Sequence, residues 1–305
     1  MLDYINNFSD DRFSYTKIKI MKKTENIFLG KKILIYGLGK SGYSSYKFLR
    51  DKADTYLFDD NLKNNSILKK KLINFKKITQ YNFDRIIISP GIDIFKCKLS
   101  KYLKKNLSKI YTDLDIFYSF YNNKSITITG TNGKSTTAKI LFDVLLDQGK
   151  DVRLIGNFGN PALSETKVSK KTIFVIEASS YQLEYSKIFS SKYAVILNIS
   201  VDHIERHKSL SNYIDAKFKL IDSQTKKDFA FVKKNDPFIE KKLKSKKFDS
   251  KIIKVNTIKN HNFLKKIKND YFFSDSNKEN LSFVIEISKK LKLNKSLFII
   301  TNTKV

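Results

Sequence analysis

Short runs of β-branched and other apolar residues recur along the 305-residue chain, and glycine or polar segments separate them. Such bounded runs predict buried strands, here over residues 32–36, 55–58, 85–89, 126–129, 152–155, 172–176, 193–197, 229–232 and 252–255. Apolar residues at helical spacing predict helices over 43–49, 137–148, 213–223 and 278–291. Because strands alternate with helices, the pattern predicts an α/β fold with doubly wound, mostly parallel sheets.

The order of these elements divides the chain into two units, and its length also suits two domains. Residues 27–122 begin as a Rossmann-like domain does, with a strand, a glycine loop and a helix. Residues 123–293 begin in the same way but with the glycine loop of a P-loop-type domain. Residues 1–26 are polar and lack clear periodicity, so we expect a loosely docked extension. The lysine-rich segment 241–247 is interpreted as solvated surface.

The glycine loop of the second unit follows the strand at 126–129 and reads Gly130-Thr131-Asn132-Gly133-Lys134-Ser135-Thr136. Between a strand and a helix, such glycines let backbone N–H groups approach phosphate oxygens, and the helix N-terminus adds partial positive charge. Lys134 can reach the β- and γ-phosphates of ATP, while Ser135 or Thr136 can hold Mg²⁺. The loop is shorter than the usual G-x-x-x-x-G-K-[ST], but its context favours an ATP-phosphate site over an ordinary glycine turn.

The glycine loop of the first unit, Gly37-Leu-Gly39-Lys-Ser41-Gly42, fits the dinucleotide-binding pattern G-x-G-x-x-G. The next strand leads into Asp59, about 20 residues beyond the glycines, where such folds bind a ribose hydroxyl. Taken alone, this unit also suits a nicotinamide-dependent oxidoreductase. That alternative would leave the second glycine loop and the histidines described below without a role.

Polar side chains also follow two later strands of the second unit. Glu177 comes directly after the strand at 172–176, and the segment after the strand at 193–197 contains Asp202, His203, Glu205 and His207. Because the carboxyl ends of parallel strands face the ligand crevice, Glu177 could complete a Mg²⁺ shell and His203 could bind a metal through neutral imidazole. The alternatives are a surface carboxylate and structural histidines. Cysteine clusters and a second spaced histidine pair are missing, which disfavours zinc.

Composition makes several classes of function less favoured. The formal net charge is +29, but only five of the 59 basic residues are arginine and the lysines are spread along the chain. Base recognition favours arginine's planar fork, so we expect no nucleic-acid partner; a basic nucleic-acid-binding protein stays the non-enzymatic alternative. A single cysteine, Cys97, rules out an internal disulfide and fits a reducing compartment. No apolar run approaches the roughly 20 residues needed to span a bilayer. We therefore expect a cytoplasmic monomer without a membrane partner.

Five motifs, in order over residues 31 to about 293, resemble those of the Mur ligases of peptidoglycan synthesis. Gly130–Thr136 resembles the ATP loop of that family, and Gly156-Asn157-Phe-Gly159 resembles its Gly-Asn-x-Gly motif. The resemblance implies that Asn157 contacts the UDP-sugar substrate. Glu177-Ala-Ser179-Ser-Tyr-Gln182 resembles the Glu-x-Ser-Ser-x-Gln motif of the family. It implies that Glu177 binds Mg²⁺ and that Ser179 and Gln182 lie near the substrate.

The remaining motifs extend the resemblance toward the end of the chain. Asn198–His207 is similar to Asn-Ile-x-x-Asp-His-x-x-Arg-His, which implies that His203 binds a second Mg²⁺. Tyr213–Lys217 resembles a segment that carries a carbamylated lysine, an anionic metal ligand, so that Ser135, Glu177, His203 and Lys217 form the implied metal set. Asn277 and Asn280 match an adenine-contacting His-Asn-x-x-Asn motif in which Ser276 replaces the histidine.

Within the family, the first unit resembles that of the ligases that add D-glutamate to UDP-N-acetylmuramoyl-L-alanine. Its implied substrate-binding residues are Gly37, Gly39, Ser41, Gly42, Asp59 and Gly91. The implied reaction uses ATP and Mg²⁺ and forms an amide through an acyl phosphate, with Lys134, Glu177, His203 and Lys217 as the catalytic set. Such ligases have a third domain of roughly 100 to 150 residues, and residues 294–305 are expected to begin the linker to it. An inactive nucleotide-binding relic is the remaining alternative.

Overall fold

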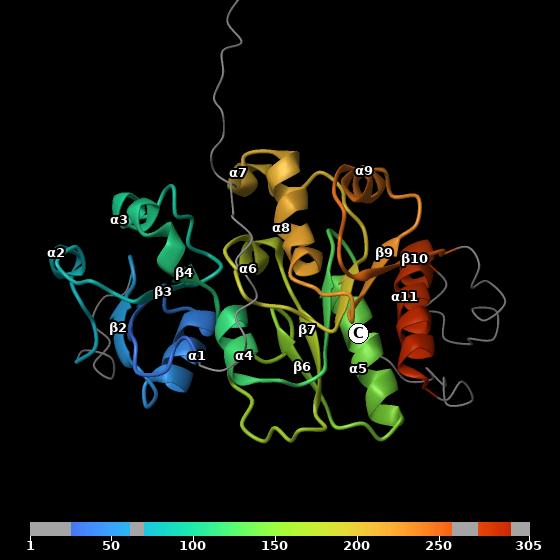
Figure 1. The fold of residues 1–305 in the computed structure, drawn as a ribbon, viewed down its shortest axis with the longest axis horizontal. Helices are drawn as coiled ribbons and strands as arrows, with labels where there is room; N and C mark the ends of the chain where they lie inside the picture. The colour runs from blue at the N-terminus through green and yellow to red at the C-terminus, as the bar shows by residue number, and fades with distance from the viewer. Residues whose placement is uncertain (1–25, 62–69, 258–273, 294–305) are drawn as a thin grey trace, which may run out of the picture.

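The computed structural model describes residues 26–61, 70–257 and 274–293, and within these ranges it contains two parallel sheets (Figure 1). The predicted α/β class and the parallel, doubly wound arrangement are therefore confirmed. We call the residues around the first sheet, 26–111, the first lobe, and those around the second sheet, 125–257 and 274–293, the second lobe. Most of the expected extension, residues 1–25, and the expected linker, 294–305, lie outside the described residues.

The sheet of the first lobe has the order β2-β1-β3-β4, and all of its pairings are parallel. Its strands are β1 (Lys32–Tyr36), β2 (Asp54–Phe58), β3 (Arg85–Ile88) and β4 (Ile110–Tyr111). Its helices are α1 (Lys40–Leu49), α2 (Phe75–Ile78) and α3 (Ser100–Lys105). The strands have few polar residues because parallel strands covered on both faces are buried along their length.

The sheet of the second lobe has the order β10-β9-β8-β5-β7-β6, again with parallel pairings throughout. Its strands are β5 (Ser125–Thr129), β6 (Val152–Gly156), β7 (Ile173–Glu177), β8 (Tyr193–Ile196), β9 (Phe229–Lys233) and β10 (Lys251–Val255). Its helices are α5 (Lys134–Asp147), α6 (Ser180–Glu184), α7 (Ile204–His207), α8 (Leu210–Asp222), α9 (Pro237–Ser245) and α11 (Asp275–Leu291).

Alternate residues of the central strands supply two apolar layers. Val175 of β7 and Val195 of β8 pack with α5 and α11 on one face of the sheet. Phe174 and Ile176 pack on the other face with α6 and α8. This alternation follows from the period of two along a strand, and it places helices on both faces, so that only the strand ends are open to ligands.

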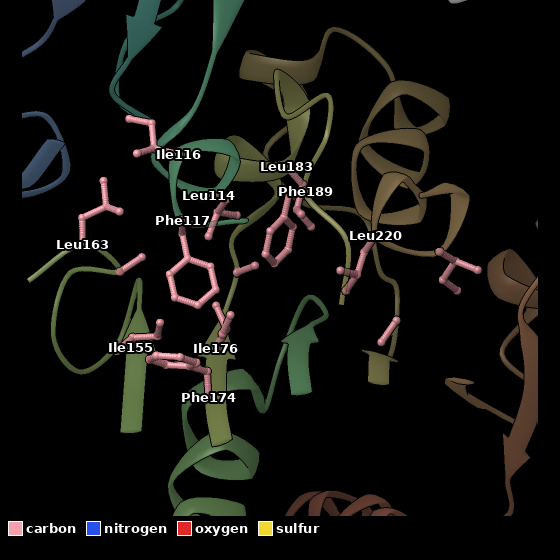
Figure 2. Packing of buried hydrophobic residues seen from close by; sticks show 14 of the residues in the cluster. Leu114, Ile116, Phe117, Ile155, Leu163, Phe174, Ile176, Leu183, Phe189 and Leu220 are labelled. Atoms are coloured by element: carbon pink, nitrogen blue, oxygen red, sulfur yellow. The ribbon is translucent and has the colours of Figure 1, made fainter. Parts of the chain in front are cut away.

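A helix between the two sheets, α4 (Asp113–Phe120), joins the lobes into one core. In Figure 2, Phe117 of α4 lies beside Phe174 and Ile176 of β7, and the rings of Phe117 and Phe174 meet edge to face with centroids 4.8 Å apart. The buried Asp115 carboxylate accepts hydrogen bonds from the backbone N–H groups of residues 187–189 at 2.8 to 3.0 Å. A buried carboxylate needs such partners, so Asp115 fixes α4 to the second lobe.

The structure changes several predicted element boundaries and adds elements that the pattern missed. The helices expected over 43–49 and 137–148 begin earlier, at Lys40 and Lys134, so both glycine loops lead directly into a helix. The short elements α2, α3, α4, α6, α7, α9 and β4 were not predicted. Part of the lysine-rich segment 241–247 belongs to α9, where Leu243 packs against the core while most of the lysines are exposed.

Within the described ranges, no helix combines the length and apolar character that crossing a bilayer requires.

Candidate active site

Three neighbouring strands of the second sheet end at the same edge, and each delivers a polar group there. β5 lies between β7 and β8. The chain continues from β5 into Gly130 and from β8 toward Asn198, and Glu177 is the last residue of β7. The order of the strands reverses at β5, and ligands of open α/β sheets bind outside the carboxyl ends of strands at such a switch point. The topology therefore places the predicted phosphate loop at the expected ligand crevice.

The phosphate loop, residues 130–136, is tightly shaped around its two glycines. Gly133 has a φ of +81°, and a Cβ at this position would lie 2.2 Å from Oδ1 of Asn280. The Lys134 ammonium donates to the Thr131 carbonyl at 2.8 Å, and burial lowers the pKa of this lysine. Ser135 and Thr136 lie on the first turn of α5. The Lys134 ammonium contacts its own loop. A phosphate oxygen that replaced the Thr131 carbonyl would therefore find this cation already in place.

Glu177 lies beside this loop and is nearly inaccessible, with 1% of its surface exposed. Its two carboxylate oxygens accept hydrogen bonds from Ser135 Oγ at 2.8 Å and from Asn157 Nδ2 at 3.1 Å. Ser135 and Asn157, which belong to two other sequence motifs, thus both contact the Glu177 carboxylate. Gly156 makes this approach possible, since its Cβ would lie 2.2 Å from the Glu177 carbonyl oxygen.

The donors around Glu177 suit magnesium. Mg²⁺ prefers oxygen ligands and usually takes only one or two protein carboxylates, with water and phosphate completing its shell. The Glu177 carboxylate and the Ser135 hydroxyl provide such a pair. In the part of the chain that the structure describes, no group of three His, Cys, Asp or Glu side chains could hold a metal ion by itself.

Lys217 of α8 points into the same region although it is a lysine with only 1% of its surface exposed. Its ammonium donates to the Gly130 carbonyl at 2.8 Å. Burial, with the nearby charge of Lys134, lowers the pKa of Lys217 to about 7. A substantial fraction of this amine is therefore neutral and nucleophilic near pH 7.

Tyr213, one turn before Lys217 on α8, connects this helix to the phosphate loop. Its hydroxyl and Thr131 Oγ1 are 3.1 Å apart, and the Lys217 ammonium lies 4.5 Å from the centre of its ring. Burial raises the pKa of Tyr213 to about 12, so the hydroxyl keeps its proton. Its place in the site was not predicted, because a lone tyrosine on an amphipathic helix has no distinguishing sequence signal.

The two histidines of the 198–207 segment differ in their surroundings. His203 is exposed, has a φ of +53°, and its Nε2 lies 3.3 Å from the Asp202 carboxylate. Its other ring nitrogen, Nδ1, is 3.2 Å from the Tyr181 hydroxyl. His207 is buried, its Nε2 lies 3.0 Å from Ser180 Oγ, and burial lowers its pKa to about 4. His203 is therefore open to solvent beside Tyr181, whereas neutral His207 is part of the buried packing.

The start of α11 closes the other side of the phosphate loop. Asn280 is buried against Gly133, and Asn277 is partly buried one turn earlier. Asn198, which was not predicted as a site residue, accepts a hydrogen bond from the Asn132 N–H at 2.9 Å and donates one to Glu279 at 3.3 Å. Asn198 thus joins the loop to α11. Its position after β8, at the carboxyl end of a parallel strand, was the sequence signal that could have identified it as a site residue.

The glycine loop of the first lobe is held by its own neighbours. Ser89 Oγ donates to the Gly37 carbonyl at 2.6 Å, and a Cβ on Gly42 would lie 1.8 Å from the same oxygen. Asp59 follows β2 as predicted, and its two oxygens accept from the N–H groups of Leu38 and Asn61 at 2.6 and 2.9 Å. Gly39 and Gly91 have open space where a side chain would project.

Ser179 and Gln182 cap α6 and also lie at the interface between the two lobes, which we call the seam. Each donates its backbone N–H to the other's side chain, at 3.1 Å from Ser179 and at 3.2 Å from Gln182. The buried Asp113 carboxylate at the start of α4 makes side-chain hydrogen bonds to both Gln182 and Ser41, while burial raises its pKa. Asp113, which was not predicted, therefore joins one candidate substrate residue of each lobe.

The chain is similar to known proteins in both sequence and fold. Residues 128–298 match the family described as Mur ligase middle domain. The chain is 37% identical over 208 residues to the UDP-N-acetylmuramoylalanine–D-glutamate ligase of Rickettsia felis, covering 66% of this chain and 46% of that protein. It is 31% identical over 281 residues to the protein of the same name from Clostridioides difficile, covering 87% of this chain and 59% of that protein.

Among solved structures, the UDP-N-acetylmuramate:L-alanyl-γ-D-glutamyl-meso-diaminopimelate ligase of Neisseria meningitides is similar in fold. Its TM-score is 0.59 at 15% identity, covering 90% of this chain and 99% of that chain. The chain spans about half the length of the Rickettsia relatives it matches.

Proposed function

The chain belongs to the Mur ligase family, and from this premise we propose that it supplies the ATP-binding and nucleotide-sugar-binding parts of a ligase. The proposed reaction adds D-glutamate to UDP-N-acetylmuramoyl-L-alanine in cytoplasmic peptidoglycan precursor synthesis. The choice of D-glutamate is supported by the names of the curated relatives at 31 to 37% identity.

One observation carries the proposal, namely the convergence of Lys134, Glu177 and Lys217 at the ends of neighbouring strands. Ser135 of the loop contacts Glu177, and Lys217 contacts the loop carbonyl of Gly130. A cation, a carboxylate and a lysine of lowered pKa around one glycine loop suit the binding and transfer of a phosphoryl group. An ordinary strand-to-helix turn would not need two buried charged side chains.

In the proposed reaction, a substrate carboxylate attacks the γ-phosphate of ATP and ADP leaves, giving an acyl phosphate. The amine of D-glutamate then attacks the acyl carbon, loses a proton, and displaces inorganic phosphate. Lys134 would exchange the Thr131 carbonyl for phosphate oxygens and offset the charge that builds on the transferred group. Asn277 and Asn280 would lie against the adenosine, because α11 begins next to the loop.

Ser135 and Glu177 would hold Mg²⁺, which neutralises phosphate charge when it is bound. We propose that His203 and a carbamylated Lys217 serve a second Mg²⁺. A neutral amine is required to react with CO₂, and the lowered pKa of Lys217 provides one. The product would be an anionic oxygen donor in place of a cation that repels metal.

The first lobe would bind the uridine nucleotide, with residues 27–122 as the substrate domain and 123–293 as the ATP domain. Gly39 and Gly91 leave room for a ligand beside the loop, and Asp59 keeps lone pairs for a ribose hydroxyl. Asn157, Ser179 and Gln182 would meet the rest of the substrate. Holding a remote uridine group in this way would position the reacting carboxylate.

The test is phosphate release from ATP by the wild-type chain and by Lys134→Ala, with UDP-N-acetylmuramoyl-L-alanine and D-glutamate added separately and together. Calorimetry of ADP with Mg²⁺ accompanies it, so that binding is measured even where turnover is slow. We expect the wild type to bind both ADP with Mg²⁺ and the UDP-substrate, and Lys134→Ala to lose most of its ADP affinity. Equal ADP affinity and equal phosphate release in the two proteins would contradict the proposal.

A further inference from the structure

Arg206 has no role in the site as described so far, yet it is unusually well fixed. It lies on α7, three residues after His203, and only 10% of its side chain is exposed. Its Nε lies 3.0 Å from a Glu184 carboxylate oxygen, and its Nη2 donates to the Ile92 carbonyl at 2.7 Å. The guanidinium also lies 5.1 Å from the centre of the Tyr181 ring. Three attachments leave this side chain a single orientation.

The contact with Ile92 crosses the seam between the lobes. Ile92 follows Ser89-Pro-Gly91, and this segment packs directly on the first glycine loop: Ser89 donates to Gly37, whose added Cβ would lie 3.0 Å from Ile92 Cγ1. A short path of direct contacts therefore runs from the glycine loop of the first lobe through Ile92 to Arg206. From there it continues along one turn of helix to His203.

A cleft at this seam gives the contact a functional setting. Its volume is about 480 Å³, and it is lined by Asp93 and Lys96 of the first lobe and by Asp202, His203 and Arg206 of the second. Arg206 thus lines a cleft between the lobes, together with the candidate metal ligand His203. Any rotation of one lobe against the other would change the distance between Ile92 and α7.

Stability alone is a weak explanation for this arrangement. A buried ion pair such as Arg206–Glu184 gains little net free energy of folding, because desolvation of both charges opposes their attraction. Its advantage is a defined geometry, since the planar guanidinium offers donors in fixed directions. Here one direction serves Glu184 in the second lobe and another serves the carbonyl in the first.

We propose that Arg206 is a positioning residue that couples the uridine-nucleotide site of the first lobe to the Mg²⁺–nucleotide site of the second. The inference rests on the proposed function for the identity of the two ligands. When the substrate orders the segment around Ile92, Arg206 holds α7 and therefore His203 in the arrangement that favours the second ligand. Each ligand then strengthens binding of the other, because such coupling is reciprocal.

Lys187 provides a matched control at the same seam. Its ammonium donates to the Leu107 carbonyl of the first lobe at 2.6 Å, so it too joins the second lobe to a backbone carbonyl of the first. Its segment, residues 186–189, carries none of the candidate site residues. If seam contacts served only to hold the lobes together, loss of either side chain would have similar effects on ligand binding.

The experiment measures by calorimetry the affinity of the full chain for ADP with Mg²⁺, without and with saturating UDP-N-acetylmuramoyl-L-alanine. Wild type, Arg206→Lys and Lys187→Met are compared. Arg206→Lys keeps a charge for Glu184 but loses the fork that also reaches Ile92. We expect the UDP-substrate to tighten ADP binding about fivefold or more in wild type and Lys187→Met, and to leave it nearly unchanged in Arg206→Lys.

A second measurement needs no ligand and separates this inference from the proposed function. Spin labels at Lys101→Cys and Lys226→Cys, both exposed positions, one in each lobe, report the distance between the lobes in a Cys97→Ser background. We expect Arg206→Lys to broaden the distance distribution and Lys187→Met to change it less. If wild type binds neither ligand, the proposed function fails and this distance decides the inference alone. Coupling retained in Arg206→Lys, coupling lost equally in Lys187→Met, no coupling in wild type that binds both ligands, or unchanged distances would overturn it.

Discussion

The two lobes contain the same tripeptide at the same place. Gly39-Lys40-Ser41 and Gly133-Lys134-Ser135 each follow the first strand of a parallel sheet and lead into a helix. Their surroundings differ. Lys40 is exposed and Gly39 has open space beside it, whereas Lys134 is partly buried and Gly133 is packed against Asn280.

The difference lies in what the neighbouring strands deliver. Beside the first loop, Asp59 and Ser89 bind the loop's own backbone. Beside the second loop, Glu177 binds the hydroxyl of Ser135, and Lys217 reaches the loop from α8. A Gly-Lys-Ser sequence at a helix start therefore indicates an anion site in general, and the adjacent strand ends decide whether charged groups for phosphoryl transfer are present.

The largest expected difference between the loops is in nucleotide binding. Lys134→Ala removes a partly buried cation and should weaken binding of ADP with Mg²⁺ about 100-fold, the upper range for a hydrogen bond to a charged group. Lys40→Ala removes an exposed lysine of the other loop and should leave this affinity within about twofold. Calorimetry on both variants gives the comparison. Similar losses in the two would show that the loops are not functionally distinct.

Alanine at the helix-capping glycines tests the backbone of each loop. Gly133→Ala should lower the free energy of unfolding by about 2 kcal/mol, because its φ of +81° is strained for alanine and Asn280 occupies the space of the new Cβ. Gly39→Ala meets open space at a φ of −65° and should change stability little. Urea unfolding of both variants measures this, and equal losses would mean that the second loop is no tighter than the first.

The acid beside each loop should respond differently to loss of its charge. Glu177→Gln keeps the shape of the side chain but removes its charge. It should raise the Mg²⁺ concentration needed for half-maximal ADP binding about tenfold, the smaller end of the range for altered metal sites. Asp59→Asn, the equivalent change beside the first loop, should leave that concentration unchanged. Titration of Mg²⁺ at fixed ADP tests the pair. An unchanged Mg²⁺ requirement in Glu177→Gln would remove this carboxylate from the metal site.

The smallest expected effect concerns pH and Lys217. In the unfolded chain this amine keeps its proton to a pKa of about 10.5, whereas in the folded protein it loses it near pH 7. Between these two pKa values the unfolded state binds more protons than the folded state. The free energy of unfolding therefore rises with pH, and this gain is lost as the pH falls through about 7. From pH 7 to 8 Lys217 should contribute about 1 kcal/mol of this rise.

Urea unfolding of wild type, Lys217→Met and the exposed control Lys227→Met at pH 7 and pH 8 isolates the contribution of Lys217. The rise should be smaller by that amount in Lys217→Met and unchanged in Lys227→Met. Equal rises in all three proteins would show that Lys217 keeps an ordinary pKa in the folded state.

Much of the fold could be predicted because its signals are local. Apolar runs such as Lys32–Tyr36 mark strands, and the pattern of Ile140, Leu141, Val144 and Leu145 marks α5. The short helices were not predictable in this way. α4 is rich in aromatic residues and forms where Phe117 packs on Phe174, which is distant in the sequence.

The same contrast between local signals and contacts of distant residues applies to the candidate site. Lys134, Ser135 and Glu177 stand next to strand ends, so topology alone brings them together. The contact of Tyr213 with Thr131 joins residues 82 positions apart, and that of Arg206 with Ile92 joins residues 114 positions apart. Such contacts depend on how whole helices dock, which the spacing of residues in one segment does not encode.

A crystal of this chain grown with ADP and Mn²⁺ in place of Mg²⁺ tests the central claim most directly, because Mn²⁺ is located by its anomalous scattering. The account predicts a Mn²⁺ peak beside Ser135 and Glu177, with the Lys134 ammonium moved from the Thr131 carbonyl to a phosphate oxygen. A nucleotide bound instead at the Gly37–Gly42 loop, or a metal peak away from Glu177, would contradict it.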